Sequence, residues 1–192
     1  MRGVVSLALG TIMVAAWTAP VSAQGRPDPA VTLASQRNAM SALAAMDGIW
    51  RGSAWVALPS GEKGTLTQTE RVGPMLDGSI KVVEGRGYGV DGALEFNAFA
   101  TISYDPGTKA YTMHSSAQGS VGDFRLTPTA NGYVWEIPAG PVTIRYTAVI
   151  ENGHWQEVGD RLMPGREPVR IFESNLDRVG NTDWPAAGAV GP

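Results

Sequence analysis

The sequence predicts an all-β fold, a closed or nearly closed antiparallel meander barrel of about ten strands with an N-terminal helix. Short runs rich in β-forming residues follow one another from residue 50 to residue 178. Each run ends at a turn signal such as Asp77-Gly78, Asn131-Gly132 or Asn152-Gly153, the dipeptides that tight hairpins favour. No helix-length segment lies between the runs, which excludes α/β folds. Closing the meander removes its exposed edges, so we expect a barrel.

The first segment, residues 1–23, has the features of a signal peptide. Arg2 supplies a positive charge, an apolar run extends from Val4 to Trp17, and Ala23 ends a small-x-small cleavage signal. The apolar run is too short to span a bilayer as a helix. We therefore expect cleavage after Ala23 and a periplasmic or secreted mature protein; an uncleaved N-terminal anchor is the alternative.

Three further segments follow the signal peptide: a linker and capping helix (residues 24–46), the barrel domain (residues 47–179) and a C-terminal tail (residues 180–192). Asp28-Pro29 has the pattern of an N-cap followed by proline at the first helical position. We expect this helix to extend to about Ala45 and to cover one end of the barrel. Trp184 of the tail is a candidate for docking on the barrel.

Composition excludes several classes of protein. The 192 residues contain no cysteine, so neither disulfides nor thiolate chemistry is available. The 15 basic and 18 acidic residues are interspersed without a basic cluster, so we expect no nucleic-acid partner. We also expect no stable membrane insertion once the signal peptide is removed. The sequence leaves the oligomeric state open.

Alternation along the strands indicates which side chains face the lumen. Tyr104 and Tyr146 each continue an apolar stripe, and Glu70 lies in phase with apolar neighbours on its strand. In the strand predicted near residues 79–88, we expect Ile80 and Val82 to face the lumen. Alternation then places Glu84 and Arg86 on the same inward face. Such groups must pair, hold water or meet a ligand. We therefore expect six residues to form a ligand-binding site: Glu70, Glu84, Arg86, Tyr88, Tyr104 and Tyr146.

Motifs for nucleotide or metal chemistry are weak. Gly87 to Gly92 matches G-x-G-x-x-G, but the run leads into a strand and not into the helix that a dinucleotide site requires. The two histidines, His114 and His154, have no metal-ligand spacing. We expect no metal and no cofactor. A haem-binding barrel similar to the nitrobindins is a minor alternative, in which His154 would be the ligand.

Gly48-Ile49-Trp50 resembles the Gly-x-Trp motif of the calycins, the lipocalins and related ligand-binding barrels. The C-terminal third resembles a bacterial family of secreted barrels that is catalogued only as a domain of unknown function. This second likeness depends on Arg145-Tyr146-Thr147, Trp155-x-Glu157, Phe172-Glu173-x-x-Leu176-x-Arg178 and Trp184-Pro185. The calycin resemblance implies that an arginine of the last strand, Arg178 or as second choice Arg170, packs over Trp50 by a cation–π contact.

The function that the sequence favours is binding of a small apolar or amphipathic molecule in the lumen, because barrels of this size can enclose one ligand. The enzyme alternative is an isomerase or hydrolase that uses Glu70 or Glu84. The structural alternative is an envelope interaction module whose lumen is packed shut by Trp135, Tyr104 and Tyr146. The sequence does not decide whether the chain is an enzyme.

Overall fold

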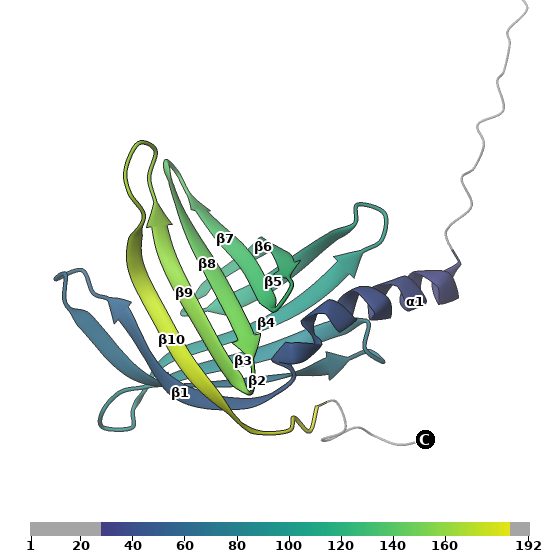
Figure 1. Cartoon of the computed structure of the whole chain (residues 1–192), viewed down its shortest axis with the longest axis horizontal. Coiled ribbons are helices and arrows are strands. Elements are labelled where there is room, and N and C mark those ends of the chain that lie inside the picture. Colours follow the sequence, from purple (N-terminus) through teal and green to yellow (C-terminus); the bar gives the residue numbers. More distant parts are fainter. Residues whose placement is uncertain (1–27, 185–192) are drawn as a thin grey trace, which may run out of the picture.

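A computed structural model of the chain describes residues 28–184, which form a closed barrel of ten antiparallel strands preceded by a helix (Figure 1). Each strand pairs with the next one along the chain, and β1 pairs with β10 to close the sheet. The predicted fold class is confirmed. The predicted signal peptide, residues 1–23, and the end of the tail, residues 185–192, lie outside the described residues.

The elements in chain order are α1 (Pro29–Met40), the 3-10 helix η1 (Ser41–Met46), β1 (Gly48–Ala57), β2 (Lys63–Met75), β3 (Ile80–Tyr88), β4 (Leu94–Asp105), β5 (Ala110–Ala117), β6 (Ser120–Thr129), β7 (Gly132–Ala139), β8 (Val142–Glu151), β9 (His154–Leu162) and β10 (Val169–Gly180). Neither helix in this part of the chain has the length and apolar character that crossing a membrane requires.

The helical segment covers one end of the barrel, as predicted. The side chain of Asp28 accepts an N-cap hydrogen bond of 2.9 Å, and Pro29 occupies the first turn, where its missing N–H costs nothing. The α-helix ends at Met40, and the chain continues as a 3-10 helix close to the predicted end. Three side chains of the segment are buried against the barrel interior: Met40, Leu43 and Met46.

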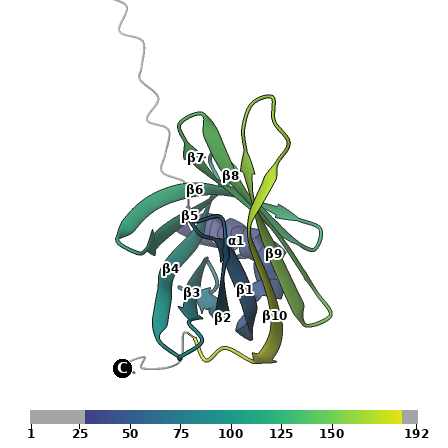
Figure 2. The same cartoon turned by 90° about the vertical axis from the view of Figure 1, so that its left-hand side faces the viewer.

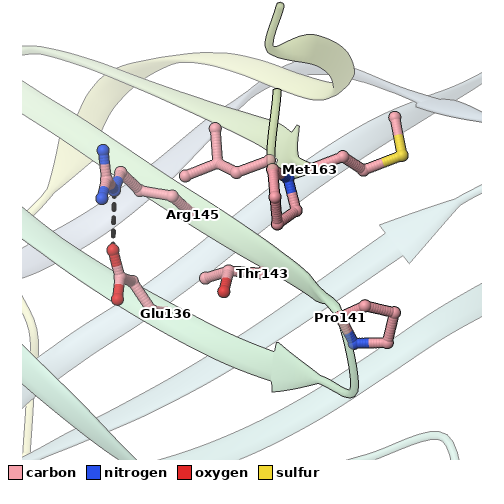
Figure 3. A pocket seen from close by; sticks show the side chains of 7 residues that line it. Glu136, Pro141, Thr143, Arg145 and Met163 are labelled. Carbon is pink, nitrogen blue, oxygen red and sulfur yellow. Dashed lines mark hydrogen bonds and ion pairs between the residues drawn. The ribbon is translucent and has the colours of Figure 1, made fainter. Parts of the chain in front are cut away.

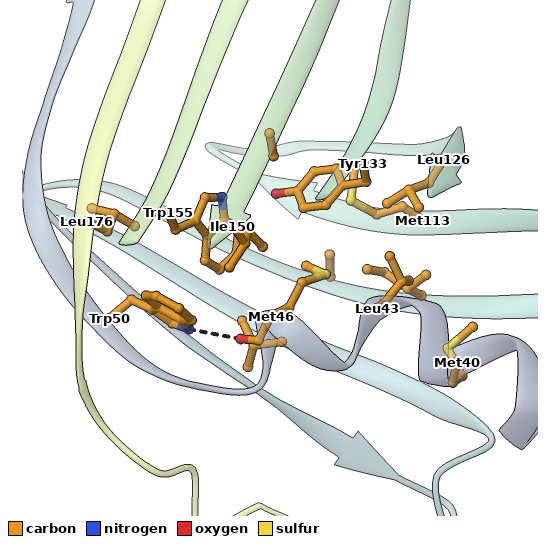
Figure 4. Close-up of a cluster of buried hydrophobic side chains, with 14 residues drawn as sticks. Met40, Leu43, Met46, Trp50, Met113, Leu126, Tyr133, Ile150, Trp155 and Leu176 are labelled. Carbon is orange, nitrogen blue, oxygen red and sulfur yellow. Dashed lines mark hydrogen bonds between the residues drawn. The ribbon is translucent and has the colours of Figure 1, made fainter. Parts of the chain in front are cut away.

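Trp50 closes this end of the lumen (Figure 4). It is 1% exposed, and its indole N–H donates to the Met46 carbonyl at 2.8 Å. Its ring meets Trp155 edge-on, with centroids 5.5 Å apart, and Trp155 in turn meets Tyr133. Trp50 thus belongs to the buried cluster at the helix end of the barrel. The rest of the cluster is Val72, Ala100, Ile102, Met113, Leu126, Ala148, Ile150 and Leu176, together with the three helical residues.

Arg178 does not form the predicted cation–π contact. Its guanidinium donates to the Asp47 carbonyl at 3.2 Å and to Asn181 at 2.9 Å, and the side chain is exposed. The register between β1 and β10 shifts at Trp50, so the guanidinium reaches the start of the strand and not the indole. There it lies over Gly48, where an added Cβ would be 2.9 Å from Nε. Arg178 therefore fastens the chain between η1 and β1.

The face of β3 that points inward is the opposite of the one predicted. Gly85 and Gly87 face the lumen, because a Cβ on Gly85 would lie 2.9 Å from the Glu70 carboxylate oxygens and one on Gly87 would meet Leu66 and Phe96 at 3.0 Å. Since side chains alternate along a strand, five residues predicted to face inward lie on the outer surface: Ile80, Val82, Glu84, Arg86 and Tyr88.

The C-terminal tail explains why the wrong face of β3 was predicted to point inward. Thr182 and Trp184 cover the outer side of Gly73, which pairs with Val82 in the sheet. The Arg71 guanidinium lies 4.4 Å over the Trp184 ring, so the expected docking of this tryptophan is confirmed. The outer face of β3 is therefore covered near Val82, and the apolar pair Ile80 and Val82 has the hydrophobic pattern of a lumen face.

Candidate functional site

The lumen has two parts that differ in packing. The closed half is the cluster around Trp50 and Trp155, whose members are buried. The open half lies toward the strand ends far from α1, and Figure 2 views the barrel with α1 behind the strands. Its inward-facing side chains are Leu66, Phe96, Ala98, Phe124, Trp135, Ile137, Ile144, Tyr146 and Phe172, and all are half-buried. These side chains are less completely covered than those of the closed half.

Two carboxylates lie where the closed half meets the open half. Glu70 on β2 accepts a hydrogen bond from the Gln68 side-chain amide at 2.7 Å and lies over Gly85. Glu157 on β9 accepts one bond from the Trp135 indole N–H at 2.9 Å and one from the Tyr133 hydroxyl at 3.2 Å. The sheet thus brings side chains from β2, β7 and β9 together at the floor of the open half.

Burial governs the charge of these groups. Burial raises the pKa of Glu70 to about 8; the Gln68 hydrogen bond works against this, and the nearby charges of Glu157 and Glu84 add to it. Burial also raises the pKa of Glu157, while its bonds from Trp135 and Tyr133 lower it. Both residues are half-buried as a whole.

Neither carboxylate has a cationic partner within the part of the chain that the structure describes. Among residues 28–184, the ion pairs include neither Glu70 nor Glu157, and no cation contributes to the pKa of either group. Lys81, which is buried at the helix end, is bound to Asp47. The floor therefore carries acidic groups without internal neutralisation.

An aromatic wall stands beside Glu157. Trp135 and Tyr146 stack with ring centroids 4.3 Å apart and an interplanar angle of 9°. Phe124 adjoins Trp135 and Phe172 adjoins Tyr146, at centroid distances of 5.5 and 5.8 Å. Gly159 makes room for the stack, since a Cβ there would lie 2.8 Å from the Tyr146 ring. The wall offers broad apolar faces next to an acidic floor.

The six residues predicted for the site lie in three places. Glu70 is at the floor and Tyr146 in the wall of the open half. Tyr104 faces inward, but it lies near the helix end and packs on Tyr111 at 4.8 Å. Three others lie on the outer surface: Glu84, Arg86 and Tyr88, with the Arg86 Nε donating to Glu84 at 3.1 Å.

The structure adds Glu157, Tyr133, Trp135 and Gln68, which the sequence-based prediction of the site omitted. Trp155, Glu157 and Gly159 lie at alternate positions on the inward face of β9. Only the first of them is apolar, so a search for alternating hydrophobic residues did not identify this face.

Both histidines lie on the outside of the barrel. His114 is bonded to Asp123 at 2.6 Å and His154 to Asp177 at 3.0 Å, and all four side chains are exposed. The haem-binding alternative requires a histidine in the lumen, and neither one reaches it. Within residues 28–184, no group of three or more His, Cys, Asp or Glu side chains could hold a metal ion.

A hollow of about 330 Å³ lies on the outer face, between the β7–β8 hairpin and the connection from β9 to β10 (Figure 3). Glu136 and Arg145 line it and are bonded to each other at 2.7 Å. Met163 and Pro141 supply apolar surface. The polar groups of this hollow satisfy each other, so the hollow lacks the unpaired charges that distinguish the floor of the lumen.

No protein-family model matches the chain, and no curated protein matches it. Among solved structures it is similar to the S-type phycobiliprotein lyase CPES from Guillardia theta, with a TM-score of 0.51 and 9% sequence identity. The similarity covers 76% of this chain and 96% of that one. At this identity the likeness is one of fold. The part of the sequence-based resemblance that concerns architecture, a closed antiparallel barrel, is confirmed.

Proposed function

We propose that this protein binds a small, partly apolar molecule in the open half of its barrel. One observation carries the proposal: the inward-facing aromatic residues of the open half are only half-buried, whereas the closed half is fully packed. A lumen with no ligand to receive would gain stability by filling this space, since each unfilled methylene of a core costs about 1 kcal/mol. Apolar walls with a few converging polar groups are typical of small-molecule sites.

The alternatives are supported less well. A lumen packed shut by Trp135, Tyr104 and Tyr146 is at odds with the accessibility of the first and third of these residues. Of the two carboxylates named for the enzyme alternative, Glu84 lies on the outer surface and Glu70 faces inward. An acid–base mechanism in this lumen would have to use Glu70 and Glu157. The fold likeness to a phycobiliprotein lyase supports small-molecule binding in general terms.

The binding proposal is tested with N-phenyl-1-naphthylamine, a neutral probe whose fluorescence rises in apolar surroundings. We expect saturable binding with one site per chain. Ala98 faces the open half beside Gly85, and Asn97 next to it points outward. Ala98→Phe should therefore weaken probe binding at least about tenfold by occupying the site, whereas Asn97→Phe adds the same ring outside the barrel and should leave binding unchanged.

The outcome depends on folded protein, so each variant is checked by thermal melting. If Ala98→Phe melts early, Ala117→Phe, which also fills the open half, replaces it. Absence of saturable binding, or binding that survives both filling variants, would refute the proposal.

We also propose that the chain is exported and that residues 1–23 are its signal peptide. The charge, the short apolar run and the cleavage pattern ending at Ala23 support this. Intact-mass measurement of the protein recovered from its native source should give a chain that begins at Gln24. A chain that still begins at Met1 would contradict cleavage.

A further inference from the structure

The barrel wall is incomplete between β6 and β7. Four residue pairs join these strands, the last of them Leu126 with Trp135, whereas every other pair of neighbouring strands shares seven to ten. Within residues 28–184, positions 120–125 of β6 and 136–139 of β7 therefore have no strand partner on the sides that face each other. We call this opening the β6–β7 split. Figure 2 shows the β7–β8 hairpin rising away from β6.

Pro138 stops the pairing of β6 with β7. The bond from the Ile150 N–H to the Asn131 carbonyl, 2.6 Å long, fixes the hydrogen-bond pattern between β7 and β8. In that pattern the main-chain groups of Pro138 face β6 and not β8. Continuing the register would set Pro138 opposite Asp123, but proline has no N–H to donate. The sequence itself therefore keeps this part of the sheet unpaired.

Water reaches the free edge of β6. The main-chain groups of Val121, Asp123 and Arg125 alternate along the strand with those that bond to β5, so they face the split. All three side chains are exposed. Main-chain N–H groups are seldom left without a partner away from water, so these groups are hydrated. The split is therefore a wetted opening in a wall that hydrogen bonds close elsewhere.

The inner side of the split lies at the aromatic wall of the open half. Phe124 of β6 and Trp135 of β7 face inward on either side of the split, with ring centroids 5.5 Å apart. Gly122 adds no side chain to this border, and a Cβ there would lie 2.7 Å from the Phe124 ring. Both rings are half-buried. A molecule that passes through the split therefore arrives against Trp135 and Tyr146, the stacked pair of the proposed site.

We propose that the β6–β7 split is the passage by which the ligand enters and leaves the open half, and that Pro138 keeps this passage open. This inference rests on the proposed function and assigns an entry route to that site. The competing route runs past the loops at the open end of the barrel. A passage lowers the same barrier for binding and for release, so closing it should slow both rates and leave the equilibrium affinity unchanged.

Cross-linking the two free edges closes the split. The chain has no cysteine, so Arg125→Cys with Glu136→Cys supplies its only thiols. The reagent 1,2-ethanediyl bismethanethiosulfonate joins them by a short bridge, which intact mass detects and dithiothreitol removes. Stopped-flow mixing of the folded protein with N-phenyl-1-naphthylamine should show that the bridge slows association and release at least about tenfold each, with Kd kept within about threefold. Dithiothreitol should restore both rates.

The matched control attaches the same bridge on the other side of β6. Thr112 of β5 pairs with Arg125 where the sheet is complete, so Thr112→Cys with Arg125→Cys joins two strands that are already closed. This bridge should leave both rates within about twofold of those of the unbridged protein. Thermal melting establishes that both bridged proteins are folded.

Pro138→Val tests the passage without a cross-link. Valine restores an N–H opposite Asp123 and favours strand structure, so the pairing of β6 with β7 should extend. Hydrogen exchange of the Asp123 amide should then slow at least about tenfold, and both rates for the probe should fall at least about twofold.

The outcomes separate this inference from the proposed function. If the probe binds and neither the bridge across the split nor Pro138→Val slows it, the ligand enters past the loops, and the passage is refuted while the binding barrel stands. A bridge that weakens binding by speeding release alone would indicate a distorted site and would also refute the passage. If the unbridged protein does not bind the probe, the binding barrel itself is refuted.

Discussion

The two halves of the lumen use the same kinds of residue differently. In the closed half, Trp50 and Trp155 meet edge-on and are at most 2% exposed, so their rings serve packing. In the open half, Trp135 and Tyr146 are stacked face to face and remain half-buried. Aromatic rings that hold a fold together are covered by their neighbours. Rings that remain accessible inside a barrel are available to something else.

The halves also differ in how they treat charge. Lys81, buried near the helix, has its counter-charge in Asp47. Glu70 and Glu157 have none among residues 28–184, although burial raises the pKa of both. Acidic groups that reduce stability and have no counter-charge within residues 28–184 indicate a role outside folding. We therefore infer that the closed half maintains the fold and that the open half serves binding.

The largest expected effect is on stability in the closed half. Trp50→Ala should lower the free energy of unfolding by about 3–5 kcal/mol, because it leaves a large cavity in a packed cluster. Trp55→Ala is the control on the same strand, since Trp55 points outward under Lys63. Its loss should cost at most about 1 kcal/mol. Denaturant melts measure both, and equal losses would contradict the assignment of Trp50 to the core.

The next largest effect is the pH dependence of the free energy of unfolding, which Glu70 at the floor of the open half should produce. A carboxyl group whose pKa is higher in the folded than in the unfolded chain keeps its proton longer in the folded state, so stability falls as pH rises. For Glu70 the window runs from about 4.5 to about 8. The loss should be on the order of 2–3 kcal/mol, after allowance for the partial accessibility of the group.

Glu70→Gln should remove most of this slope, and Glu84→Gln should leave it unchanged. Urea melts at intervals between pH 5 and pH 9 measure the slope. A wild-type stability that rises over this window would mean that Glu70 is compensated by a partner.

A smaller effect is expected at the aromatic wall. Trp135→Phe keeps a ring but removes the indole N–H that donates to Glu157. Since a hydrogen bond to a charged group contributes about 1.5–3 kcal/mol, and this one is partly accessible, we expect a loss of about 1–2 kcal/mol. The pKa of Glu157 should rise further. Carbon-detected NMR titration of the Glu157 carboxyl checks this, and an unchanged pKa would show that the bond does not matter.

The smallest effect is expected at Arg178. It is exposed and fastens the chain before β1 through the Asp47 carbonyl, so Arg178→Ala should cost about 1 kcal/mol or less. The fluorescence of Trp50 should not change. A shift in Trp50 emission would indicate that Arg178 does contact the Trp50 ring, as the calycin resemblance implies.

Much of the fold could be predicted because its signals are local. Turn dipeptides mark hairpins at the places where the structure has them. Asn131-Gly132 lies between β6 and β7, and Asn152-Gly153 lies between β8 and β9. Strand β8 has one polar face and one apolar face, and Ile144, Tyr146 and Ile150 lie on the apolar one. Its inward-facing residues could therefore be predicted from the alternation.

The site was harder to predict because its determinants are not local. The phase of β3 depends on the tail residue Trp184, which lies far away in sequence and covers the outer face of the neighbouring strand. Glu157, the second carboxylate of the site, comes from β9 and not from the strand of Glu70. Gly85 and Gly159 are informative only when the side chains that occupy their space, Glu70 and Tyr146, are known.

The division of the lumen is tested most directly by following the tryptophan indole N–H signals in proton–nitrogen NMR spectra while N-phenyl-1-naphthylamine is added. Trp135 in the open half and Trp50 in the closed half report on the two parts in one titration, and Trp55 and Trp184 report on the outer surface. We predict that the Trp135 signal shifts progressively to saturation while the Trp50 signal stays in place. Movement of the outer signals alone, or of none, would contradict a binding site in the open half.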